Sequence, residues 1–148
     1  MPELALFSPI VSLVLFAVWP LLLVMCIGLW RLALGSTGQM PAGGFPAGTP
    51  HGSDGYWRLN RAHLNTVENL PIFGVLVLAG LHLQLADPLF QTLTNVVVLA
   101  RVGQTLTHLT STAFAMVLVR FSFYVVQVLS MLGIAGLCLS AAGFSLAS

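Results

Sequence analysis

Long apolar segments alternate with short polar ones along the whole chain of 148 residues. Four of the apolar segments are long enough for a helix that crosses a bilayer, which takes about 20 mostly apolar residues. They cover approximately residues 4–34, 56–85, 89–109 and 113–143. This pattern predicts an all-α fold, a transmembrane four-helix bundle that forms a single domain over residues 1–148.

The connections between the apolar segments are short. Residues 35–55 contain seven glycines and three prolines with almost no charge, which is typical of an irregular connection. Tight turns are expected at residues 86–88 and 110–112. Because the first apolar segment is longer than a secretory signal and follows no positively charged region, we expect it to be a retained span.

The composition favours a membrane location. Hydrophobic residues make up 57% of the chain and charged residues 6%, and the mean hydropathy is +0.97, which is too apolar for a soluble domain of this length. The net charge of +1 provides no basic surface for nucleic acid. The four histidines and two cysteines lack metal-ligand spacing. We therefore expect an integral membrane protein with no metal and no nucleic-acid partner.

The positions of the charges predict an orientation. Arginines near the first and third connections are Arg31, Arg58, Arg61, Arg101 and Arg120. The opposite side has Glu3 and Asp87. Since positively charged loops tend to stay in the cytoplasm, connections 1 and 3 should be cytoplasmic and both termini non-cytoplasmic. The expected location is a bacterial inner membrane or a membrane of the endoplasmic-reticulum type.

Polar side chains recur at helical spacing in the last three segments. Residues three and four apart share one face of a helix. Such residues are Arg58, Arg61, Asn65 and Glu68, then Arg101, Gln104 or Thr105, and His108, and finally Arg120, Tyr124 and Gln127. A charge at the bilayer centre costs about 2.5–3.5 kcal/mol, so we expect these faces to line one arginine-rich pocket in the cytoplasmic half of the bundle. Its excess positive charge favours an anionic ligand.

Some of these residues have simpler interpretations. Arg31 and Arg58, near the ends of spans, fit anchors that extend to the membrane interface. Arg61 and Glu68 fit a buried structural ion pair, and Asn65 and Asn69 fit hydrogen bonds between helices. Aromatic residues that fit an interfacial belt are Trp19, Trp30, Tyr56 and Trp57.

The chain has no recognisable nucleophile motif of its own. It lacks a Gly-x-Ser-x-Gly segment and a Ser-His-Asp set. A nucleophile would therefore come from a bound cofactor. A positively charged, partly dehydrated site lowers the pKa of a thiol by favouring the thiolate. Arginine suits such a site because it stays charged and donates hydrogen bonds.

The segment Arg61-Ala62-His63-Leu64-Asn65-x-x-Glu68-x-x-Pro71 resembles the second-helix signature of the membrane-associated proteins in eicosanoid and glutathione metabolism. This family includes microsomal glutathione transferases. Arg101-Val102-x-x-Thr105 and Arg120 extend the resemblance over about residues 31–127. The resemblance implies a homotrimer of four-helix subunits that binds glutathione between subunits on the cytosolic side.

The resemblance also implies roles by position. Residues that would bind the glutathione peptide are Arg61, Asn65, Glu68, Arg101 and Thr105. Arg31 and His63 resemble contributors from the neighbouring subunit, and Arg120 resembles the catalytic arginine that stabilises the thiolate. His108 stands where known members have a ligand-contacting tyrosine, which makes it a further candidate for binding glutathione. Asn69 stands where some members have another tyrosine.

Three functions fit these features. The first is a glutathione transferase or peroxidase, a detoxification activity on lipophilic electrophiles or lipid hydroperoxides that arrive from the bilayer. The alternative is a non-catalytic member of the same family that binds lipids or partners, which the substituted tyrosine positions favour. The third is a small transporter that uses Glu68 and His108 as a proton relay.

Overall fold

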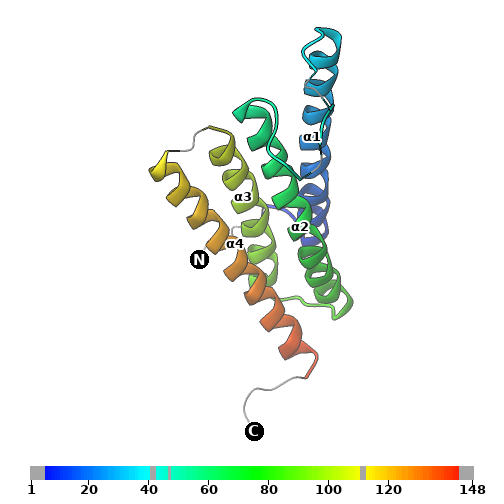
Figure 1. Ribbon diagram of the computed structural model, residues 1–148. Helices are drawn as coiled ribbons and strands as arrows, with labels where there is room; N and C mark the ends of the chain where they lie inside the picture. Colours follow the sequence, from blue (N-terminus) through cyan, green and yellow to red (C-terminus); the bar gives the residue numbers. More distant parts are fainter. Residues whose placement is uncertain (1–5, 41–42, 47, 111–112, 144–148) are drawn as a thin grey trace.

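The protein forms four α-helices over the part of the chain that the computed structural model describes, residues 6–40, 43–46, 48–110 and 113–143. They are α1 (Pro9–Ser36), α2 (Asp54–His82), α3 (Pro88–Thr110) and α4 (Phe114–Ala141). The helices alternate in direction, so that the α1–α2 and α3–α4 connections lie at one end of the molecule and the α2–α3 turn at the other (Figure 1). The expected all-α four-helix bundle is confirmed.

Local chemistry explains where the helices begin. Pro9 occupies the first turn of α1, where a missing N–H is tolerated. The Ser53 side chain caps α2 by accepting from the Tyr56 backbone N–H at 3.3 Å. Asp87 Oδ1 accepts from the Leu89 backbone N–H at 2.8 Å where α3 begins. Residues 4 and 5 of the first predicted span, and the predicted charge at Glu3, lie outside the described residues.

Three of the helices, α1, α2 and α4, are long and apolar enough to cross a membrane. The remaining helix, α3, has 23 residues but is more polar. Its polar side chains are turned inward, and those that are buried are Thr94, Asn95, Arg101, Gln104 and Thr105. The other helices therefore cover the polar face of α3, whose own crossing of the bilayer stays a prediction.

The α2–α3 pair forms the centre of the bundle. Both α1 and α4 pack against this pair, and they lie on opposite sides of it (Figure 1). The main apolar core lies in the half of the bundle near the α2–α3 turn, with Phe16, Phe73, Phe90 and Ile134 at most 1% exposed. The outer faces carry many exposed apolar side chains, such as Leu21 at 62% exposure, which suits contact with lipid or with another chain.

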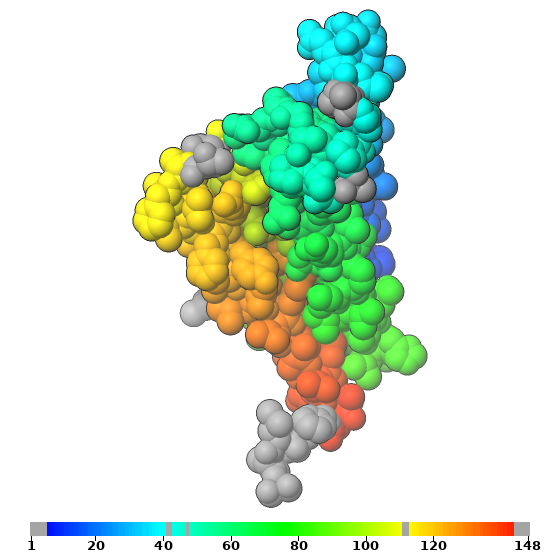
Figure 2. All heavy atoms as spheres, in the orientation of Figure 1, coloured from blue at the N-terminus to red at the C-terminus, as the bar shows by residue number. Residues whose placement is uncertain are grey.

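The first connection lies against the helices that it joins. The Phe45 and His51 rings lie 6.0 and 5.2 Å from the ring of Tyr56, measured between centroids. Figure 2 shows this connection, in cyan, against the green surface of α2. Tyr56 is fully buried, at 0% exposure, so its assignment to an interfacial belt was wrong. The connection is irregular, as predicted, but aromatic contacts hold it on the bundle.

Glycines allow the helices to approach closely. A Cβ atom on Gly80 of α2 would overlap the ring of Phe90 on α3. A Cβ atom on Gly103 of α3 would lie 2.7 Å from the Phe123 ring of α4. The second contact seats the first half of α4 on α3, next to the polar side chains described below.

Replacing Gly80 with alanine should destabilise the bundle. The Phe90 ring is 1% exposed and belongs to the core, so it has little room to move away from an added methyl group. We expect a loss of about 1–3 kcal/mol from overpacking, measured as a lower midpoint of thermal unfolding in detergent. In Gly136→Ala, the matched control, the new Cβ meets nothing within 4 Å, so stability should not fall. Equal midpoints for the two variants would contradict the close α2–α3 contact.

Candidate functional site

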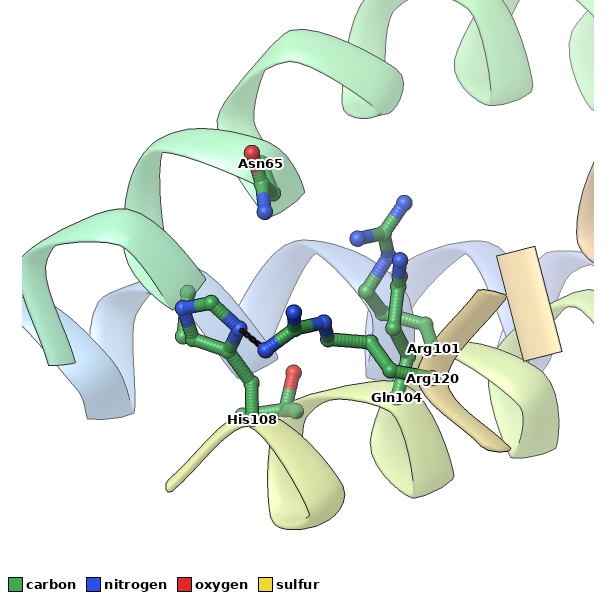
Figure 3. Close-up of a pocket in the computed structure, with 7 residues that line it drawn as sticks. Asn65, Arg101, Gln104, His108 and Arg120 are labelled. Atoms are coloured by element: carbon green, nitrogen blue, oxygen red, sulfur yellow. Dashed lines mark hydrogen bonds between the residues drawn. The ribbon is translucent and has the colours of Figure 1, made fainter. Parts of the chain in front are cut away.

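A small polar pocket lies between α2, α3 and α4, in the half of the bundle nearest the first and third connections. Its lining residues are Ala62, Asn65, Arg101, Gln104, Thr105, His108 and Arg120. Figure 3 shows the side chain of Arg120 reaching from α4 towards His108 of α3, with Asn65 of α2 on the other side. The three predicted polar faces therefore do meet, each through some of its residues.

Arg101 brings a buried positive charge to this pocket. Its side chain is 2% exposed, and the guanidinium carbon lies 5.8 Å from the centroid of the Phe16 ring. The Nε and Nη2 atoms have no hydrogen-bond partner among the described residues. None of the residues that line the pocket is acidic. Glu68, which does not line the pocket, interacts electrostatically with Arg101. Because buried guanidinium donors without hydrogen-bond partners are costly, the pocket is poised to accept an anionic group.

His108 and Arg120 are bonded to each other across the α3–α4 interface. Arg120 Nη1 donates to His108 Nδ1 at 2.6 Å (Figure 3). The other ring nitrogen of His108, Nε2, is buried without a partner in the described chain. One side of the imidazole therefore contacts Arg120, while the other is available inside the pocket.

The remaining polar residues of α3 are held in different ways. Thr105 Oγ1 accepts from Trp19 Nε1 of α1 at 3.1 Å. Gln104 Oε1 is buried with no partner among the described residues. Trp19, assigned from the sequence to an interfacial belt, thus supports the pocket instead. The pocket therefore contains unpaired nitrogen atoms of Arg101 and His108 and an unpaired acceptor, the side-chain oxygen of Gln104.

A second set of hydrogen bonds joins α4 to α2 one turn away. Gln127 Nε2 donates to Asn69 Oδ1 at 3.2 Å, and Asn69 Nδ2 donates to the backbone oxygen of Asn65 at 2.7 Å. The bond from Gln127 confirms that Asn69 takes part in a hydrogen bond between helices, and the same structural role of Gln127 was not predicted. The signal that identifies them is the presence of amide side chains in an apolar helix, which are costly unless they are paired.

Asn95 is a further buried amide that the sequence analysis missed. It is 1% exposed, accepts from the backbone N–H of Phe7 at 3.0 Å and donates to the backbone oxygen of Phe7 at 2.9 Å. These bonds tie the segment before α1 to α3. Asn95 lies at the opposite end of the bundle from the pocket and is structural.

Three predicted site residues of α2 lie outside this pocket in the single chain. Arg61 and Glu68 are exposed, and His63 is half-buried. The alternative of a buried Arg61–Glu68 ion pair is therefore wrong for the chain by itself. Their binding roles stay predictions, and any such role would involve a ligand or a second chain on the outer face of α2.

Arg31 is held within its own chain. Its Nε donates to the Tyr56 hydroxyl at 2.7 Å, and its guanidinium carbon lies 4.9 Å from the centroid of the Phe45 ring. Arg31 is half-buried rather than free at the surface. It does not line the pocket, and its role towards a neighbouring subunit stays a prediction.

Comparison with known proteins agrees with this architecture. A family model described as the MAPEG family matches residues 9–140, most of the chain. The chain belongs to the MAPEG family. Comparison with individual curated proteins gave no significant match. MAPEG proteins are transmembrane helix bundles, and they include glutathione-dependent transferases and peroxidases as well as non-catalytic members.

Membership in MAPEG agrees with the resemblance that the sequence motifs carry. The matched range includes every candidate residue of the site, from Arg31 to Arg120. MAPEG proteins are typically trimeric and bind glutathione. Glutathione is anionic, and an anionic ligand is what a pocket with unpaired arginine donors favours.

We expect Arg101 to contribute to ligand binding rather than to the stability of the bundle. Replacing buried ion pairs by apolar side chains of similar volume is often neutral or stabilises by about 1–4 kcal/mol, and the same reasoning applies to a buried arginine whose Nε and Nη2 have no hydrogen-bond partner among the described residues. We expect Arg101→Met to keep or raise the midpoint of thermal unfolding in detergent without ligand. The control is Arg31→Met, which removes an arginine that is hydrogen-bonded to Tyr56 and should lower the midpoint. A large loss of stability in Arg101→Met would indicate a structural role.

Proposed function

We propose that this MAPEG protein is a glutathione-dependent membrane enzyme, a transferase or peroxidase that acts on lipophilic electrophiles or lipid hydroperoxides. The observation that supports this function best is that Arg101 and Arg120 converge on a pocket whose lining has no acidic residue. Such a site favours the thiolate over the thiol of glutathione, because the two guanidinium groups stabilise negative charge in a medium of low dielectric constant.

The thiolate would be the nucleophile in either reaction. In conjugation, the sulfur forms a bond to the electrophilic carbon, and the leaving group departs with the bonding electrons. In peroxide reduction, the sulfur attacks one oxygen of the O–O bond, an alcohol leaves, and the resulting sulfenic acid condenses with a second glutathione to give a disulfide and water. Arg120 has the catalytic role in both, because it holds the sulfur as thiolate.

The small size of the pocket suggests that it binds only one part of glutathione and that the rest of the molecule binds outside it. The volume of the pocket is about 10 Å³, enough for one water-sized group. The pocket itself therefore suits one functional group of the tripeptide, with Asn65, Arg101, Thr105 and His108 around it. The rest of glutathione would lie over the outer side chains of α2, which include the exposed Arg61 and Glu68 and the half-buried His63.

A neighbouring subunit would complete this site. Arg61 and Glu68 are exposed on a helix that is apolar enough to span a membrane, and contact with lipid alone would leave both charges poorly solvated. A homotrimer, typical of the MAPEG family, would cover them, and Arg31 of an adjacent copy is then a candidate ligand. We also propose that connections 1 and 3 and the pocket are on the cytoplasmic side.

An apolar groove beside the pocket suits the lipophilic substrate. It has a volume of about 370 Å³ and runs along the boundary of α2 and α4 (Figure 2). Its polar members, Asn69 and Tyr124, follow Asn65 and Arg120 by one helical turn. A hydrophobic molecule in the groove would lie one turn from the thiolate and would reach the groove directly from the bilayer.

Loss of the Arg120 guanidinium should abolish most of the activity. We expect Arg120→Met to lower kcat for glutathione conjugation or lipid hydroperoxide reduction by about 10²–10³-fold, the usual effect of removing one charged or dipolar stabiliser of a developing anion. The measurement uses purified full-length protein in detergent or vesicles. His82→Met changes an exposed residue at the other end of α2 and is the control. Wild-type activity in Arg120→Met would remove Arg120 from the mechanism.

The non-catalytic alternative has one observation in its favour. His108 and Asn69 replace tyrosines of known members, and both are occupied by contacts within the chain, to Arg120 and Gln127. A lipid- or partner-binding protein has no need to retain the glutathione site. Isothermal titration of the wild-type protein and Glu68→Ala with glutathione separates the two functions. Saturable heat that weakens in Glu68→Ala supports the enzyme, and no saturable heat in the wild type supports the alternative.

A further inference from the structure

The contact between His108 and Arg120 defines the protonation state of the imidazole. An arginine side chain has five N–H donors and no acceptor, so in the 2.6 Å contact Arg120 Nη1 is the donor and His108 Nδ1 the acceptor. Since Nδ1 carries no proton, the ring is neutral and its proton is on Nε2. The contact thus requires one of the two neutral tautomers.

Arg120 directly follows a segment of α4 whose side chains are exposed. The first buried residue of α4 is Gln127, about two turns after Arg120, and the described residues 113–119 are all exposed. A long arginine side chain on such a segment has many rotamers available, and ordering it costs entropy. The bond to His108 selects the rotamer that reaches the pocket.

His108 is well placed to serve as a fixed support. It lies near the end of α3, on the same helical face as Arg101 and Thr105. Nearby, the missing side chain of Gly103 allows α3 and the Phe123 ring of α4 to approach closely. The acceptor is therefore on the central helix, and the arginine that it binds is on the peripheral one.

We propose that His108 is the positioning residue of Arg120, and that its Nδ1 atom holds the guanidinium in the orientation that faces the bound thiolate. This inference rests on the proposed function and explains how a histidine serves at a position where known members have a tyrosine. His108 transfers no proton in this role. The competing role is a donor role for its Nε2–H, which is buried in the pocket without a described partner.

Three substitutions of His108 distinguish the role of its Nδ1 atom from that of its Nε2 atom. In His108→Asn the amide oxygen can occupy the place of Nδ1, in His108→Gln the amide reaches the place of Nε2, and His108→Leu offers neither. We expect kcat to fall about 10²-fold in the Leu and Gln variants, as for a misplaced catalytic group, with little change in KM for glutathione. The Asn variant should keep most of the wild-type kcat. Wild-type kcat in His108→Leu, or recovery by Gln and not by Asn, would overturn the proposal.

A spectroscopic measurement tests the contact without any activity. The ¹⁵N resonances of the His108 ring in the full-length protein can be assigned by their loss in His108→Asn. We expect an unprotonated Nδ1 and a protonated Nε2, and a mixture of tautomers in Arg120→Met. A proton on Nδ1 in the wild-type protein, or the same single tautomer in Arg120→Met, would rule out the contact.

The two measurements distinguish failure of this inference from failure of the proposed function. If the wild-type protein shows glutathione-dependent turnover and the His108 variants do not follow the expected order, the inference alone fails. If the wild-type protein shows no turnover, the proposed enzymatic function fails, and the nitrogen resonances still decide whether His108 positions Arg120.

Discussion

The burial of the Arg101 guanidinium is the constraint on which the rest of the structure depends. A charged group on a helix in a membrane cannot face lipid without a cost of several kcal/mol, so α3 must be covered around its polar face. The positions of α1, α2 and α4 satisfy this requirement. The Phe16 ring lies over the guanidinium from α1, while α2 and α4 bring polar side chains to a pocket whose lining has no carboxylate.

The bundle divides into a half that stabilises and a half that can bind. Near the α2–α3 turn, aromatic and aliphatic side chains form a continuous buried core, and the Asn95 amide satisfies the backbone of Phe7. Near the other end, Arg101, Gln104 and His108 keep polar atoms without partners in the described chain. Unpaired buried atoms lower stability, so the apolar half compensates for a pocket whose polar atoms a ligand would satisfy.

Helical periodicity was enough to predict which side chains of α3 share the pocket, because residues 101, 104, 105 and 108 are three or four apart. It could not predict that Arg61 and Glu68 stay exposed, since spacing says which residues share a face and not which face turns inward. Helical periodicity also could not predict contacts between segments that are far apart in the sequence. The bonds of Trp19 to Thr105 and of Arg31 to Tyr56 depend on how α1 lies against the other helices.

The exposed charges of α2 provide the strongest argument that the proposed site is completed by assembly. Glu68 follows the start of α2 at Asp54 by about 20 Å, at 1.5 Å per residue. If α2 crosses the membrane along its length, as its composition allows, this carboxylate would be too far from the helix end to reach water with its short side chain, and Arg61 lies on the same outer surface. Beyond the electrostatic interaction of Glu68 with Arg101, both exposed charges need polar partners in a membrane. A neighbouring copy and a glutathione molecule held between the subunits would supply them, and the pocket around Arg101 and Arg120 would then receive the thiolate end of that ligand.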